Sequence, residues 1–343
     1  MAVGDQAFGA VLSTIAYRQE STYGTDAVTT TALQCLEPIS IGFKTEIETK
    51  KLESLGVNRG YNRQVQLNKS VGGTLETYMH AEESSRFLIN AMGGNYTFTS
   101  LTAAGTHSIS AGNLTSTDTL TSFTFAVRKG NAHSYRYTGG VINSLKMSAS
   151  VGEEVKFSAD FVFQDSTIGT ADLSGSLSIS SVAPLVYVDG TYRYDATEGS
   201  LTSSVAEAIQ SFELEINNNL LTDEKNRQLG TRIISGRPPA LKREVNFKIM
   251  QRYDTTTTFN RFIQNTTGAA QLRFVGASIS AEYNRELLVT MPNVRMRNTE
   301  PALEGQDSVI QSEIEFDVLI SGGATTTARE IGMTLQNAQN AKL

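Results

Sequence analysis

The chain has 343 residues, a formal net charge of −6 and 19% charged residues, with six prolines and no tryptophan. Its length predicts two domains of ordinary size, and its composition is typical of a β-rich globular protein rather than a disordered one. No apolar run approaches the about 20 residues of a membrane-spanning helix, and the N-terminal residues lack the basic start of a secretory signal. We therefore expect synthesis in a cytoplasm, with the single Cys35 as a small, partly buried side chain without a disulfide partner.

Alternation of apolar and polar residues is the main structural signal along the chain. In residues 155–163, for example, Phe157 and Phe161 fall on one face while Lys156 and Asp160 fall on the other. The same pattern predicts strands at residues 43–49, 122–128, 141–151, 212–217, 245–249 and 313–318, with a strand-like island at 184–194. So many strands require closure or partners, because open sheet edges promote aggregation.

Two short amphipathic helices are predicted between these strands. The helix at 82–92 has its apolar residues on one side and stops at Gly93. The helix at 255–264 has Phe262 and Ile263 on its apolar side. We expect each helix to cover one end or one face of a sheet.

The order of these elements occurs twice. Residues 71–94 and 241–268 both contain an alternating strand, a short helix and then glycine, and a strand followed by a long basic segment precedes each copy. A repeat of this size predicts a duplicated domain rather than a solenoid. The stretch 95–120 has no counterpart and is interpreted as a surface insertion. The predicted organisation is an N-terminal arm (1–33), a first domain (34–170), a linker with a crossing strand (171–204), a second domain (205–322) and a C-terminal arm (323–343).

The sequence carries no signature of catalysis or of cofactor binding. No glycine-rich nucleotide motif, HExxH or CxxC occurs. His80, His107 and His133 lack a second metal ligand at helical or hairpin spacing, so surface or helix-capping positions are expected for them. Paired carboxylates occur, but a glycosidase would be expected to surround them with sugar-stacking tryptophan. We therefore expect neither an enzyme nor a bound cofactor or metal.

The basic residues gather in two segments at equivalent places in the two copies. Segment 50–69 has five basic residues and one acidic residue, and segment 222–243 has six and two, so each carries +4. The chain as a whole carries −6, which leaves −14 for the remainder. A solvated loop is the simpler explanation for either segment alone. The shared asymmetry favours docking onto an acidic neighbour, with contact to nucleic-acid phosphate as the open alternative.

Several of these features together carry a resemblance to a known family. The runs AYRQESTYGT (Ala16 to Thr25) and SFELEINNNL (Ser211 to Leu220), the strand with its long loop and the helix with its glycine stop resemble the tail tube proteins, or major tail proteins, of long-tailed bacteriophages. The resemblance covers nearly the whole chain. It implies a mainly β fold of tandem β-sandwich or barrel domains of the tail-tube type, each with a short flanking helix, whose inner sheets join those of neighbours around a channel.

The resemblance also implies an assembly. A chain with two tube domains is expected to form trimeric rings with pseudo-sixfold symmetry, stacked into a virion tail tube that conducts double-stranded DNA into the host without binding it specifically. Further expected partners are the tape measure protein and the tail terminator or tip proteins. The long loops are the family's device for stacking rings, and here we expect them to become ordered on the neighbouring ring. The candidate inter-ring residues are Lys50, Lys51, Leu55, Val57, Arg59, Arg63, Lys225, Arg227, Arg232, Ile233 and Arg237.

A channel that passes DNA should present few cations, because each phosphate contact with Lys or Arg adds affinity. The alternating carboxylates Glu213, Glu215, Glu313, Glu315 and Asp317 are therefore the candidate lumen residues, and the outer wall is their alternative location. Two other protein classes stay open. One is another viral or secreted injection-tube subunit, and the other is a carbohydrate-binding or adhesive β-sandwich of a virion or cell surface.

For the carbohydrate-binding alternative, an aromatic platform is required. Tyr187, Tyr192 and Tyr194 are the residues that would form it. A glycan array would separate this interpretation from a tail tube.

Overall fold

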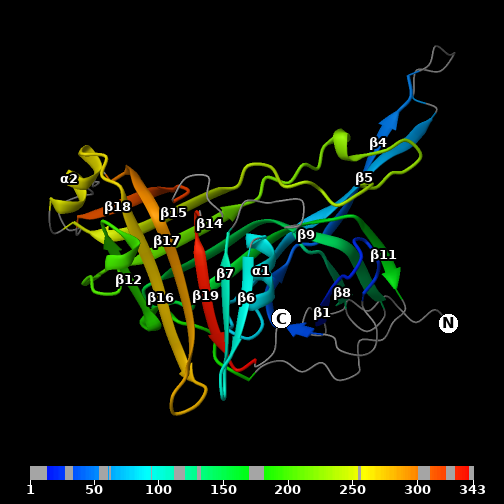
Figure 1. The fold of residues 1–343 in the computed structure, drawn as a ribbon. Coiled ribbons are helices and arrows are strands. Elements are labelled where there is room, and N and C mark those ends of the chain that lie inside the picture. The colour runs from blue at the N-terminus through cyan, green and yellow to red at the C-terminus, as the bar shows by residue number, and fades with distance from the viewer. Residues whose placement is uncertain are drawn as a thin grey trace.

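The fold is mainly β, as predicted, and consists of antiparallel strands connected into one sheet system with two short α-helices in the part of the chain that the structure describes (Figure 1). The computed structural model describes residues 14–27, 34–53, 61, 63–93, 95–111, 120–129, 133–169, 181–253, 256–299, 310–321 and 329–339. Among these residues no helix has the length and apolar character needed to span a membrane.

The first half of the chain forms a unit of nine strands, a helix and an added hairpin. Its strands are β1 (Thr14–Gln19), β2 (Gln34–Leu36), β3 (Pro38–Ile41), β4 (Lys44–Lys51), β5 (Gln64–Tyr78), β8 (Phe123–Lys129), β9 (His133–Ser150), β10 (Lys156–Phe163) and β11 (Asp165–Gly169). Helix α1 (Ser85–Met92) follows β5, and the added hairpin consists of β6 (Asn95–Ser100) and β7 (Gly105–Ser110).

The second half repeats this series. Its strands are β12 (Gly190–Asp195), β13 (Ala206–Glu207), β14 (Ser211–Asn217), β15 (Glu244–Arg252), β16 (Gly268–Ser278), β17 (Asn284–Asn298), β18 (Gln311–Val318) and β19 (Gly332–Asn337). Helix α2 (Thr257–Ile263) follows β15. Short 3-10 turns lie at Tyr187–Asp189, Glu198–Ser200 and Glu224–Asn226.

The strand pairings show that the two halves have the same topology. In the first unit, β1 pairs with β2 and β8, β9 pairs with β8, β10 and β11, and β5 pairs with β10, β3 and β4. In the second, β12 pairs with β13 and β16, β17 pairs with β16, β18 and β19, and β15 pairs with β18 and β14. Strand β1, within the predicted arm, and β12, within the predicted linker, therefore hold equivalent places, as do β11 and β19.

Within one sheet, the units join through a strand pair at the centre of the molecule. Strand β9 of the first unit pairs with β14 of the second along seven residues, from Ser150↔Ser211 to Ser144↔Asn217. The result is one sheet with the order β3-β5-β10-β9-β14-β15-β18-β17, which we call the shared sheet. Apart from β4, the remaining strands form a second layer on each unit, and the long strands β9 and β17 run from one layer into the other.

The stretch interpreted as a surface insertion has a structural role instead. Strand β7 pairs with β19 of the second unit, so the hairpin extends the second layer across the boundary between the halves. Strand β7 is rich in Thr, Ser and Gly, so its sequence shows no clear apolar period. In the structure, Gly105, His107 and Ile109 are buried and alternate with more exposed residues.

The core of the first unit is a cluster of aromatic rings between the two layers. Phe161 of β10 lies with its ring centroid 4.9 Å from Phe125, 5.7 Å from Phe163 and 5.9 Å from Phe43, and the side chain is fully buried. Such edge-to-face contacts add to the hydrophobic contribution of burial. The period-2 pattern of residues 155–163 thus marks the most tightly packed strand.

Phe161→Ala is expected to destabilise the subunit by about 3–5 kcal/mol, because the cavity it leaves is lined by rigid rings. Urea unfolding followed by tyrosine fluorescence measures this change. Ile168→Ala serves as the control, since that side chain on β11 is 70% exposed and its loss should cost under about 0.5 kcal/mol. Equal losses for the two variants would contradict the assignment of the core.

The two helices differ in burial although they hold equivalent places. Helix α1 buries Phe87, Leu88 and Met92 and ends at Gly93, whose φ of 49° is the left-handed cap predicted from the glycine stop. Helix α2 has no buried residue, and Ile263 is 65% exposed. The expectation that both helices cover a sheet is therefore met fully only by α1.

Candidate assembly surfaces

One face of the shared sheet is polar across both units, while the other face carries the core. The registers place Lys156, Ser148, Glu213, Lys248 and Glu315 in one row across five adjacent strands. Side chains alternate between the two faces along each strand, so the chain neighbours of these residues lie on the buried face. Leu214 and Phe247 are examples. All five candidate lumen residues lie on the polar face.

Basic side chains accompany the carboxylates on this face. Lys248 Nζ lies 2.5 Å from Glu315 and 3.5 Å from Glu313, and Arg297 contacts both Glu315, at 3.0 Å, and Asp317, at 3.3 Å. The hydrogen bond from Lys248, with a further contribution from Arg297, lowers the pKa of Glu315. The pairs are largely solvated, so they organise the surface more than they stabilise the fold.

The net charge of the polar face is slightly negative. Its carboxylates are Glu76, Asp160, Glu213, Glu215, Glu244, Glu313, Glu315 and Asp317, and its basic residues are Lys146, Lys156, Lys248, Arg252, Arg295 and Arg297. Eight negative and six positive groups leave two negative charges per chain. The alternating carboxylates in the sequence predicted an acidic face, whereas the structure shows a face on which carboxylates and basic side chains form ion pairs.

A second surface is a ribbon that projects from one end of the shared sheet (Figure 1). It consists of β4 and residues 64–70 of β5, and we call it the ribbon. Every residue of β4 is exposed, including Ile47 at 43%, and Leu67 on β5 is exposed as well. An apolar side chain on both strands of a projecting element is typical of a surface that another molecule covers.

The two basic segments lie together rather than projecting separately. The connection between β14 and β15, which contains residues 222–243, runs back along β5 at the base of the ribbon. There Arg227 donates to the Lys69 carbonyl at 3.2 Å, and Arg232 donates to Gln66 at 2.8 Å. The second segment is thus ordered within its own chain, contrary to the expectation that both loops become ordered on a neighbour.

The candidate inter-ring residues therefore divide into three groups. Lys50, Lys51, Arg63 and Lys225 are exposed, with Lys51 lying over the ring of Tyr61. Arg227, Arg232 and Arg237 make contacts inside the chain, and Ile233 is half-buried. Leu55, Val57 and Arg59 lie outside the described residues.

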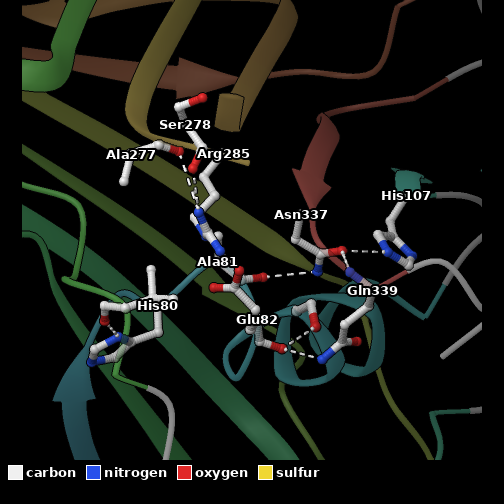
Figure 2. A network of polar contacts seen from close by, with 11 residues as sticks. His80, Ala81, Glu82, His107, Ala277, Ser278, Arg285, Asn337 and Gln339 are labelled. Atoms are coloured by element: carbon white, nitrogen blue, oxygen red, sulfur yellow. Dashed lines mark hydrogen bonds and ion pairs between the residues drawn. The ribbon is translucent and has the colours of Figure 1, made fainter. Parts of the chain in front are cut away.

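A polar network fixes the two units relative to each other beside α1 (Figure 2). Arg285 of β17 pairs with Glu82, which precedes α1, at 2.5 Å, and both side chains are nearly buried. Asn337 of β19 donates to the Ala81 carbonyl at 3.0 Å and contacts His107 Nε2 through its side-chain oxygen at 3.1 Å. The polar groups of each half find their hydrogen-bond or ion-pair partners in the other half. The network therefore specifies a single orientation of the two units.

The histidines and tyrosines of the alternative interpretations are mostly buried. His80 is 6% exposed and His107 is fully buried, where burial lowers its pKa, so the surface positions expected for these two are wrong. No cluster of three or more metal-ligating side chains occurs among the described residues. Tyr192 and Tyr194 belong to the core, which leaves only Tyr187 exposed of the three tyrosines proposed as a sugar platform.

Cys35 is buried in β2, and burial raises the pKa of its thiol to about 11. Thiolate is the reactive form of cysteine, so this environment makes the side chain inert. Its predicted role as a small apolar group of the core is consistent with this position.

Comparison with known proteins agrees with the duplicated, mainly β architecture. A family model described as phage tail tube protein matches residues 11–318, which is most of the chain and includes the first unit and the second unit up to β18. No curated protein matches the chain significantly. The chain therefore belongs to the phage tail tube proteins, a family of structural proteins of the virion tail.

Proposed function

We propose that three copies of this chain form a closed ring, that rings stack into the tail tube, and that viral DNA passes along the channel lined by the shared sheets. One observation carries this proposal. The junction between the two units inside the chain covers a strand edge and a helix of the first unit, and the equivalent edge and helix of the second unit are uncovered in the single chain.

The strand edges identify which surfaces would meet. Inside the chain, β9 pairs with β14. The equivalent of β9 in the second unit is β17, whose residues 295–298 pair with β18 only, and the equivalent of β14 in the first unit is β3, which pairs with β5 only, within the described residues. Pairing β17 of one copy with β3 of the next would repeat the internal junction and remove both open edges.

The helices give the same result. The second unit covers α1, and Asn218 donates to the Ala91 carbonyl at 2.9 Å and to the Ile142 carbonyl at 3.1 Å. Among the described residues, helix α2 has no such cover, which explains why Ile263 is exposed and Phe259 and Phe262 are only half-buried. In a ring, the first unit of the next copy would lie against α2 as the second unit lies against α1.

Closed symmetry then sets the number of copies. A heterologous contact repeated around an axis closes into a ring or continues as a filament. Each chain supplies two units of equal topology, so three chains supply the six positions of the pseudo-sixfold ring implied by the family resemblance. The topology supports a division of the chain into two units. The exact domain boundaries predicted from the sequence stay predictions.

Ile263→Asp is expected to leave the subunit folded and to prevent ring formation. The side chain is 65% exposed in the single chain, so the fold does not need it, whereas a carboxylate desolvated against the next copy is unfavourable. Sedimentation velocity under assembly conditions measures the effect as loss of rings and larger species. Asn260→Asp adds the same charge on an exposed position of the same helix and should assemble at close to the wild-type rate. Normal rings from the Ile263 variant would place α2 outside the contact.

The polar face is the part of the shared sheet that we assign to the channel. Its buried side faces the second layer of each unit, so closure of the sheet would leave the polar side toward the axis. A small negative excess, with Lys146, Lys248 and Arg297 paired with carboxylates of the same face, suits passage of DNA, because long-range attraction for phosphate is weak.

The remaining partners follow from a tube of this kind. A tape measure protein would occupy the channel before DNA, and terminator and tip proteins would cap the ends of the stack. Synthesis and assembly are proposed to occur in the cytoplasm of the bacterial host. Mass spectrometry of purified tails tests whether these proteins accompany the subunit.

A further inference from the structure

The ribbon is poorly supported by its own two strands. Residues 64–70 of β5 pair with β4 and both strands are largely exposed, whereas residues 71–78 of β5 also pair with β10. A two-stranded antiparallel pair is at best marginally stable in water. The direction in which the ribbon projects therefore depends on what contacts its base.

Strand β11 makes some of those contacts, since Lys69 Nζ pairs with Asp165 at 2.5 Å. Residues 222–237, which we call the brace, hold the backbone of β5 itself. The Lys69 amide donates to the Arg232 carbonyl at 2.8 Å. Arg227 donates to the Lys69 carbonyl at 3.2 Å, to the Ser70 hydroxyl at 3.0 Å and to the Arg232 carbonyl at 2.8 Å. One guanidinium thus holds the β5 backbone and the brace backbone together, using the several fixed donors that lysine lacks.

The brace is itself anchored to the body of the protein. Ile234 is buried, and its carbonyl accepts a hydrogen bond from Gln164 at 3.2 Å. Arg237 lies 5.7 Å from the ring centroid of Tyr23. Ile234 and Arg237 hold one end of the brace to the body of the protein. The contacts of the brace with β5 therefore hold the ribbon in one direction.

Electrostatics also favour Arg227 at this position. A cavity of about 340 Å³ between the ribbon and the brace is lined by Glu46, Glu48, Asp223, Glu224 and Arg227. Arg227 is the one basic residue among the described residues that line this cavity, and the carboxylates of the lining come from both elements. Without Arg227, like charges would face each other across the cavity and favour separation.

We propose that the brace converts the ribbon into a rigid docking element whose partner is a second copy of this chain in the adjacent ring. The docking surface is composite, since the exposed Leu229 of the brace adds to Ile47 and Leu67 of the ribbon. The equivalent parts of the two units thus differ in role. In the first unit, β4 and β5 form the projecting ribbon, whereas in the second unit the connection between β14 and β15 supports that ribbon. A trimeric ring presents three axial docking elements rather than six. The partner and the count rest on the proposed function, whereas the bracing itself does not.

Hydrogen exchange of the Lys69 amide in the unassembled full-length subunit tests the bracing, because that amide bonds to the brace. Arg227→Ala is expected to speed its exchange at least about tenfold, since breaking contacts of ordinary net strength shifts a local opening by that factor. Lys225→Ala removes the same charge from an exposed side chain of the brace and should leave the rate unchanged. Arg227→Lys keeps the charge but reaches fewer acceptors, so an intermediate rate is expected. Unchanged protection of Lys69 in Arg227→Ala, with core amides of β10 also unchanged, would overturn the proposal.

Assembly provides the second measurement, and it separates failure of the bracing from failure of the proposed function. Arg227→Ala should form rings at the wild-type rate and elongate into tubes at least about tenfold more slowly. Wild-type elongation by a variant whose Lys69 amide has lost protection would overturn the docking part. Wild-type protein that never forms tubes would reject the proposed function while the exchange result on the single subunit still decides the bracing.

Discussion

Replacing residues 52–63 with an Asn-Gly turn is expected to abolish tube formation and to leave a folded subunit that still forms rings. Lys51 and Gln64 face each other across the ladder, so a two-residue turn can close the shortened hairpin. The replaced residues connect β4 to β5, and we propose that they contact the next ring. Exposed ion pairs contribute only about 0–1 kcal/mol each, so stacking depends on many contacts made together, and the loss should be complete. Electron microscopy of the assembled material would show rings without tubes.

The same operation elsewhere provides the control for this variant. Ser278 and Asn284 also face each other at the end of a hairpin, and an Asn-Gly turn in place of residues 279–283 shortens the β16–β17 connection. That variant should form tubes of normal length. Tubes of normal length from the ribbon variant would show that other elements, such as the terminal arms, join the rings.

Charge reversal at Glu313 and Asp317 is expected to slow DNA ejection strongly without preventing assembly. Changing both to lysine takes the polar face from two negative charges to two positive charges per chain, and both positions are about half exposed. Each new phosphate contact adds sequence-independent affinity that falls with salt. Ejection from variant particles should therefore be slow at low salt and approach the wild-type rate at high salt. Glu315 is left intact because it anchors both Lys248 and Arg297.

A matched variant tests whether slow ejection depends on where the new positive charges lie or only on the total charge of the chain. Asp26→Lys with Glu282→Lys changes the chain by the same amount at exposed carboxylates that are not on the polar face. Its ejection rate should equal that of wild type. If the Glu313 and Asp317 variant also ejects at the wild-type rate at every salt concentration, the polar face does not line the channel.

Local patterns predicted the elements well, because the periodicity of side chains depends only on neighbours in sequence. The strand at 155–163 and the helix stop at Gly93 are examples, and the order of elements revealed the duplication. The hairpin at 95–110 was missed as structure because Thr, Ser and Gly occupy positions that would otherwise show an apolar period. Its partner, β19, lies more than 220 residues away in sequence, at Asn337↔Gly105 for example.

The candidate surfaces were predictable only in part for the same reason. Alternating carboxylates identified one face of β14 and β18, but the cations that pair with them come from β9, β15 and β17, which register alone brings together. The two basic segments appeared equivalent because their charges are equal. Their different roles depend on contacts such as Arg227 with Lys69, which join residues 158 positions apart.

The number of chains in one ring is the most direct test of this account. A helical reconstruction of the assembled tube should show three chains per ring with alternating first and second units, β17 of one chain paired with β3 of the next, and the polar face toward the axis. Six chains per ring, or a ring in which β17 and β3 of neighbouring chains do not meet, would contradict it.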